Sequence, residues 1–153
     1  MPGSIAFSST GGSNATLWIK EAGFDNQGWT NVVRPTVTAM CVAGTQVGSC
    51  VSLSEGSGGY NATLVDITNL PAAPAVGVVQ SVAGSTCVIC LSGIAPSIAL
   101  YMAPNAAMYV GQNGLITTDT SQFVAPYYLQ QMGRAVSATD GVLNVGDVSL
   151  YRS

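Results

Sequence analysis

The stretch Thr36-Val37-Thr38-Ala39-Met40-Cys41-Val42 largely alternates between polar and apolar residues, and Tyr60-Asn61-Ala62-Thr63-Leu64-Val65-Asp66-Ile67 repeats the pattern. Successive side chains of a β-strand point to opposite faces of the sheet, so this alternation is typical of a strand with one buried face. Val, Thr, Ile and Tyr, which favour strands, supply much of both stretches. The two stretches therefore predict β-structure that packs one side on a core.

Similar runs recur along the rest of the chain, and Gly, Asn, Ser and Pro separate them about every 8–12 residues. A helical turn is conceivable only around Val124–Gln131, where Pro126 weakens it. The fold class predicted is all-β, with a small β-sandwich or barrel-like domain at the C-terminal end. Further strands are expected at 15–20, 29–33, 47–54, 76–82, 86–92, 98–102, 108–110, 115–118, 131–136, 142–145 and 148–151.

Changes in composition divide the chain into three zones. Residues 1–34 are rich in Gly, Asn and Ser and are predicted to form a β-hairpin arm. Residues 35–70 are predicted to form a β-meander with a flexible tip at Ser54-Glu55-Gly56-Ser57-Gly58-Gly59. The Pro/Ala segment Leu70-Pro71-Ala72-Ala73-Pro74 is interpreted as a stiff boundary, after which residues 71–153 form the C-terminal domain.

Charge is scarce in this chain. Charged residues make up 7% of the 153 residues and hydrophobic residues 48%, whereas about a quarter of an average soluble domain is charged. A surface with so little charge suits a protein that is covered by a partner or by copies of itself. The four basic residues form no stripe, so we expect no nucleic-acid partner.

Targeting segments are not evident either. The N-terminus lacks a basic region followed by a long apolar run, and Pro and Gly interrupt the most apolar region, 72–110. We therefore expect no membrane partner and synthesis in a cytosol.

Side chains for catalysis are few. The chain has no histidine, the commonest general acid, base and metal ligand. It also lacks a Gly-x-Ser-x-Gly elbow, a Gly-x-Gly-x-x-Gly loop and a Walker-type loop. The sequence therefore predicts a protein that is not an enzyme and that needs no cofactor or metal.

The four cysteines are candidates for a metal site or for a disulfide. Cys87-Val88-Ile89-Cys90 matches C-x-x-C, but strand residues surround it, and positions i and i+3 of a strand point to opposite faces. We expect four small, buried, reduced thiols. The alternative is a Cys41–Cys50 disulfide across a hairpin through Gly44–Gly48. Asp140-Gly141, between apolar runs, predicts a hairpin turn rather than a calcium loop.

Aromatic residues are the best candidates for an interface. Trp18 and Trp29, the two tryptophans, lie in one short hairpin that is too small to be stable alone. Either this hairpin folds back on the main domain or its aromatics anchor another chain, since tryptophan is enriched at interface hot spots. The candidate interface residues are Trp18, Ile19, Trp29, Tyr127 and Tyr128.

The N-terminal zone contains Gly3-Ser4-Ile5-Ala6-Phe7, followed in order by Leu17-Trp18-Ile19-Lys20, Gly23, Asn26 and Gly28-Trp29. This pattern resembles a module common in phage tail fibres, tailspikes and head-attached proteins. In those families the module lies near the N-terminus of trimeric virion proteins, so the resemblance implies a trimer.

The C-terminal half contains, in order, Val76-Gly77-Val78-Val79, Ser92-Gly93-Ile94, Ala107–Thr118 and Met132-Gly133-Arg134-Ala135-Val136. These motifs are similar to those of the small "β-tulip" sandwich of phage capsid cement proteins and head fibres. The resemblance covers about half the chain, and the segment 117–131 and the zone 35–70 depart from it. These motifs are structural, so they imply no catalytic residue.

Together the resemblances imply a structural virion protein, made in the host cytoplasm and located on the capsid exterior. As a trimeric cement (decoration) protein it would bind the major capsid protein and stabilise the shell. The alternative is a head or tail fibre or appendage protein that attaches to the host surface, where a host glycan would be a partner. A chain of 153 residues leaves no room for a long shaft, which favours cement.

Overall fold

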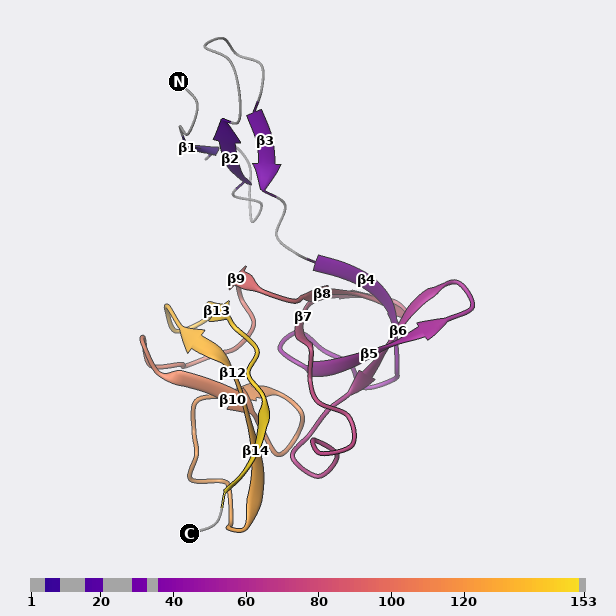
Figure 1. Cartoon of the computed structure of the whole chain (residues 1–153), viewed down its shortest axis with the longest axis vertical. Helices are drawn as coiled ribbons and strands as arrows, with labels where there is room; N and C mark the ends of the chain where they lie inside the picture. The colour runs from indigo at the N-terminus through magenta and orange to yellow at the C-terminus, as the bar shows by residue number, and fades with distance from the viewer. Residues whose placement is uncertain (1–4, 9–15, 21–28, 33–35, 152–153) are drawn as a thin grey trace. The chain divides into compact units, whose positions relative to one another are not determined.

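A computed structural model of the chain describes residues 5–8, 16–20, 29–32 and 36–151, with side chains for 36–151. The chain divides into two compact units, Met1–Arg34 and Pro35–Ser153 (Figure 1). All regular elements of the described residues are strands, which confirms the predicted all-β class. No helix in these ranges is long and apolar enough to cross a membrane.

The first unit contains a small antiparallel sheet. Its strands follow the chain order β1-β2-β3, with bounds β1 Ile5–Ser8, β2 Thr16–Lys20 and β3 Trp29–Val32. The β2–β3 pair is the hairpin that the sequence predicted, and β1 adds a strand that the sequence analysis did not expect.

The second unit begins with a closed five-stranded barrel. Its order is β4-β6-β5-β7-β8, with β4 returning to pair with β8. The strands are β4 Thr36–Cys41, β5 Cys50–Gly56, β6 Gly59–Leu64, β7 Gly77–Ala83 and β8 Thr86–Cys90. The barrel interior is filled mainly by small side chains, as a barrel of so few strands requires: Ala39, Val51, Ala62, Val79, Cys87 and Ile89.

The predicted meander over 35–70 is wrong, because β4 does not pair with β5. Strand β4 pairs in parallel with β6 on one side and antiparallel with β8 on the other, and these two pairings close the barrel. Within residues 36–70, only β5 and β6 form a hairpin, which turns between Gly56 and Gly59. Alternation sets which face of a strand is buried, but it does not set which neighbours the strand takes.

A six-stranded sheet completes the unit. Five strands follow the order β11-β10-β12-β13-β9, and β14 pairs with the first half of the long strand β12. The strands are β9 Gly93–Ala95, β10 Ala107–Val110, β11 Ile116–Thr117, β12 Tyr127–Ala135, β13 Gly141–Leu143 and β14 Val148–Tyr151.

In this region one predicted strand is absent, the one helical turn considered possible is not formed, and the predicted hairpin turn is present. Residues 98–102 form no strand. They belong to an irregular connection, here called the turn at 97–102, in which Ser97 and Tyr101 have φ values of 54° and 62°. The segment 124–131 contains no helical turn. The peptide bond between Ala125 and Pro126 is cis, and strand β12 begins at the next residue, Tyr127. Asp140-Gly141 does end the hairpin connection between β12 and β13.

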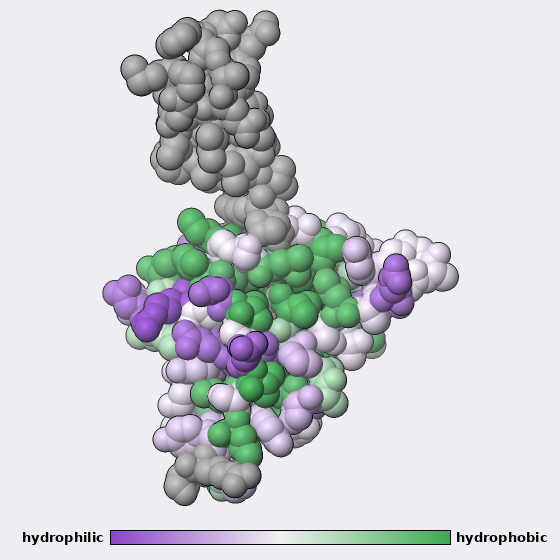
Figure 2. Space-filling view, viewed as in Figure 1, coloured by the Kyte–Doolittle hydropathy of each residue, from purple (hydrophilic) through white to green (hydrophobic). Residues whose placement is uncertain are grey.

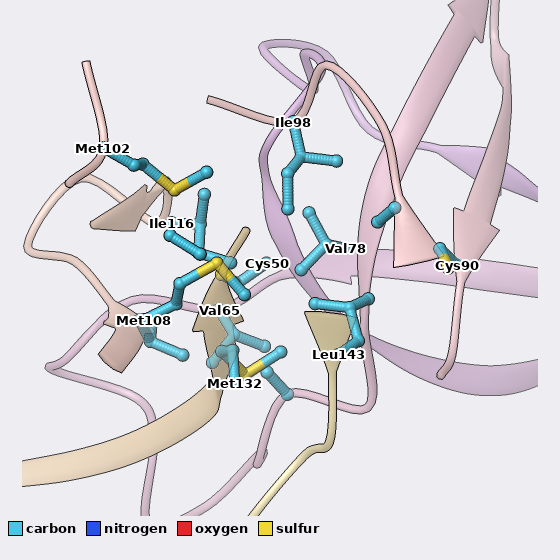
Figure 3. Close-up of a cluster of buried hydrophobic side chains, with 14 of the residues drawn as sticks. Cys50, Val65, Val78, Cys90, Ile98, Met102, Met108, Ile116, Met132 and Leu143 are labelled. Carbon is cyan, nitrogen blue, oxygen red and sulfur yellow. The ribbon is translucent and has the colours of Figure 1, made fainter. Parts of the chain in front are cut away.

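One apolar core joins the barrel to the sheet (Figure 3). Cys50, Val78 and Cys90 reach it from barrel strands, whereas Met132 and Leu143 come from the sheet. The Pro/Ala segment at 70–74 therefore does not separate two cores. The sequence predicted a domain boundary at this segment. In the structure, the barrel contains strands from both sides of it: β4, β5 and β6 precede the segment, and β7 and β8 follow it.

The cysteines sit in different surroundings. Cys87 faces the barrel interior and Cys90 the shared core, so the two point to different sides as predicted from their spacing. All four cysteines lie in the described residues, and no disulfide joins them. A Cys41–Cys50 hairpin bridge has no basis, because β4 and β5 are not paired neighbours. Cys50, Cys87 and Cys90 are buried, as expected, and Cys41 is half-buried.

Burial is expected to make two of these thiols unreactive. It raises the pKa of Cys50 to about 12, and burial together with the adjacent Cys41 thiol raises the pKa of Cys87 to about 11. The thiolate is the reacting form, so both side chains are almost wholly protonated at about pH 8. Iodoacetamide labelling followed by mass spectrometry should leave both unmodified in the native protein and modify all four cysteines in concentrated guanidinium. Rapid native labelling of Cys50 would contradict the burial described.

Candidate interaction surfaces

An aromatic stack fixes the ribbon formed by β12 and β14. The ring of Tyr127 stacks on Phe123 with centroids 5.2 Å apart and on its cross-strand partner Tyr151 at 5.1 Å. Such stacked pairs add stability beyond the area they bury. Tyr127, one of the predicted interface residues, is thus engaged within the unit.

The next residue along β12 points the other way. Tyr128 is exposed and pairs with Leu150 of β14, which is exposed as well. Cross-strand partners lie side by side on one face of a sheet, so the two form an apolar pair open to solvent. Of the two predicted tyrosines, Tyr128 is the one available to another molecule.

The structure places the predicted N-terminal residues on paired strands. Trp18 pairs with Asn31, Ile19 with Thr30, and Trp29 with Lys20. Their side chains lie outside the described part of the structure, so their role at an interface stays a prediction.

Further exposed apolar side chains were missed by the sequence analysis. Ile94 and Val142 are cross-strand partners of β9 and β13 and are both exposed, and Leu100 and Tyr101 protrude from the turn at 97–102. Figure 2 shows hydrophobic residues gathered over the part of the second unit where β4, β8 and β9 lie. Ile94 begins no alternating run, so periodicity gave no signal for its exposure.

A cleft of about 600 Å³ opens beside this turn. One wall is the segment 97–102, and the other walls come from Gln46 and Val47, from 115–119 and from Asn113 and Gln122. Apart from Asp119, the lining side chains are uncharged.

Three carboxylates of the described residues, those of Asp66, Asp119 and Asp140, accept hydrogen bonds within the second unit. Hydrogen bonds from Thr68, through its hydroxyl and its backbone N–H, lower the pKa of Asp66, and those from Ser121 lower the pKa of Asp119. Asp140 accepts a hydrogen bond from the backbone N–H of Ser97. Within the described ranges, no group of three His, Cys, Asp or Glu side chains is placed to hold a metal ion.

Within the described residues, the surfaces available for interaction therefore include apolar pairs on sheet faces and a cleft whose one charged lining residue is Asp119. Comparison of the chain with protein-family models, with curated proteins and with solved structures gave no match.

Proposed function

We propose that this chain is a structural virion protein that binds the outside of a tailed-phage capsid as a homotrimer and cements the shell. The observation that carries the proposal is the abundance of exposed apolar side chains on a unit with very few charges. The sequence resemblances of the N-terminal zone and of the C-terminal half support the same assignment.

A cement protein acts through binding energy alone. Each copy stabilises the shell by its preference for the assembled lattice over free capsid subunits. Broad uncharged contacts suit this task, because burying them incurs no charge desolvation. In a trimer at a local three-fold position, three weak contacts act together and raise the overall affinity.

The chain offers two kinds of contact for this role. The exposed pairs Tyr128–Leu150 and Ile94–Val142 lie on faces of the six-stranded sheet and suit contact with the major capsid protein. The N-terminal unit carries Trp18 and Trp29 and would serve as the arm that reaches a neighbouring subunit or holds the trimer together.

The proposal is tested on the purified protein and on particles that lack it. Light scattering should give a mass about three times the 15.5 kDa of the chain. Added to such particles, the protein should bind and raise the temperature at which the shells open, and an electron-microscopy reconstruction should show it on the exterior. A stable monomer that leaves no density on capsids would overturn the proposal.

Replacing both Trp18 and Trp29 by alanine is expected to weaken capsid occupancy or trimerisation by about tenfold or more, as loss of hot-spot residues does. The second unit should stay folded, which its unfolding temperature reports. Tyr60→Ala, which removes an exposed aromatic from the barrel, is the matched control and should leave occupancy unchanged. Equal occupancy of the double variant and wild type would show that the tryptophans are not the anchor.

A further inference from the structure

The turn at 97–102 is a rigid wall of the cleft described above. Ile98 and Met102 are buried in the shared core at its two ends. The backbone N–H of Ile98 donates to the carbonyl of Thr139 at 2.9 Å, and that of Met102 donates to the carbonyl of Ala138 at 3.0 Å. The residues between these anchors are therefore held in one position.

Tyr101, which belongs to this wall, has a strained backbone conformation. Its φ of 62° lies in the left-handed region, which is unfavourable for an aromatic residue. Tyr101 as a residue is 92% exposed, so contacts within the protein do little to offset this strain. Strained residues that give no packing in return are characteristic of binding sites, where the strain presents a side chain to a ligand.

The facing wall is polar and preorganised. Gln122 donates through its side-chain amide to the Thr117 hydroxyl at 3.1 Å and to the Asp119 carbonyl at 2.7 Å. Asp119 accepts from Ser121 through one carboxylate oxygen. Within the described chain, the other Asp119 oxygen, the Asn113 amide NH₂ and the Thr118 hydroxyl make no hydrogen bond, which leaves them for a ligand.

The charge of the cleft narrows the class of ligand. No Lys or Arg lines it, and Asp119 carries a negative charge, so phosphates, nucleotides and acidic sugars lack a counter-charge there. An entirely apolar ligand would leave the amide and hydroxyl groups unpaired. A neutral sugar fits both walls, since its hydroxyls pair with amides and carboxylates while its C–H face packs on an aromatic ring.

We propose that the cleft between the turn 97–102 and the segment 113–122 binds a neutral saccharide, with Tyr101 as the stacking platform and Asn113, Thr118 and Asp119 as hydrogen-bond partners. A volume of about 600 Å³ accommodates one or two pyranose rings. This inference goes beyond capsid attachment and holds or fails independently of it.

In the test, the full chain is titrated with glucose, galactose, mannose, N-acetylglucosamine and their common disaccharides. Two-dimensional NMR spectra recorded at each step monitor binding. N-acetylneuraminic acid serves as the charged comparison. At least one neutral sugar should shift the resonances of residues 97–102 and 113–122 in a saturable manner. No saturable shift with any neutral sugar, or tighter binding of the acidic sugar, would overturn the proposal.

The decisive variant is Tyr101→Gly. Glycine relieves the positive φ, so the unfolding temperature should stay the same or rise, while affinity for the sugar falls by about tenfold or more. Tyr128→Ala removes an exposed tyrosine that does not line the cleft and should bind the sugar as wild type does. A Tyr101→Gly protein that binds with unchanged affinity would overturn the role of the ring and with it the site.

Discussion

Replacing Gln130 by methionine is expected to lower the free energy of unfolding by about 3 kcal/mol, because it leaves buried backbone groups without partners. Gln130 is 2% exposed in strand β12. Its amide accepts from the N–H of Ala75 at 2.8 Å and donates to the carbonyls of Ala75 at 2.8 Å and Gly146 at 3.0 Å. Ala75 lies just before barrel strand β7, so this one side chain ties the barrel to the sheet.

Methionine keeps the length of the side chain and removes only its polar end, so urea unfolding of the variant isolates the hydrogen bonds. Gln131→Met is the matched control. Gln131 is exposed and its amide makes one long bond, 3.3 Å to the carbonyl of Gly133, so its loss should change stability by less than about 0.5 kcal/mol. Equal stabilities of the two variants would show that Gln130 does not join the barrel to the six-stranded sheet.

Gly133→Ala is expected to be more damaging still, at about 4 kcal/mol or more, or to prevent folding. Gly133 has a φ of 144°, and a Cβ there would lie 2.0 Å from the carbonyl oxygen of Val142 and 3.0 Å from the Cα of Leu143. These are backbone atoms of the neighbouring strand β13, in which Leu143 is the register partner of Gly133. The clash can be relieved only by separating β12 from β13.

Two further glycines separate the effect of a positive φ from the effect of a steric clash. Gly84 has a φ of 62° but open space around it, so Gly84→Ala should cost only the backbone strain, about 1 kcal/mol. Gly58 has open space and no positive φ, so Gly58→Ala should be neutral or slightly stabilising. Soluble yield and thermal unfolding should rank the variants Gly58, Gly84 and Gly133 in that order of increasing damage. A Gly133→Ala protein as stable as the Gly84 variant would contradict the close approach of the strands.

Candidate contact residues were only partly accessible from sequence. Tyr127 and Tyr128 are adjacent and identical in type, yet one stacks between Phe123 and Tyr151 while the other is open to solvent. Which of them faces outward depends on the register with β14, and no local pattern encodes that register. Tyr101 gave no signal either, because its exposure results from a turn whose ends are fixed by a distant hairpin.

The sequence by itself determined the all-β class, the hairpin β2–β3, the hairpin turn ending at Asp140-Gly141 and the opposite facing of Cys87 and Cys90. Each of these follows from local rules of strand alternation, turn chemistry and side-chain direction. Only the tertiary structure decided that β4 lies between β6 and β8, that barrel and sheet share one core, that Gln130 bonds Ala75 and Gly146, and that Gly133 lies close against the backbone of β13. Those features arise where segments far apart in the chain come together, and the energy of such contacts depends on packing that no single segment contains.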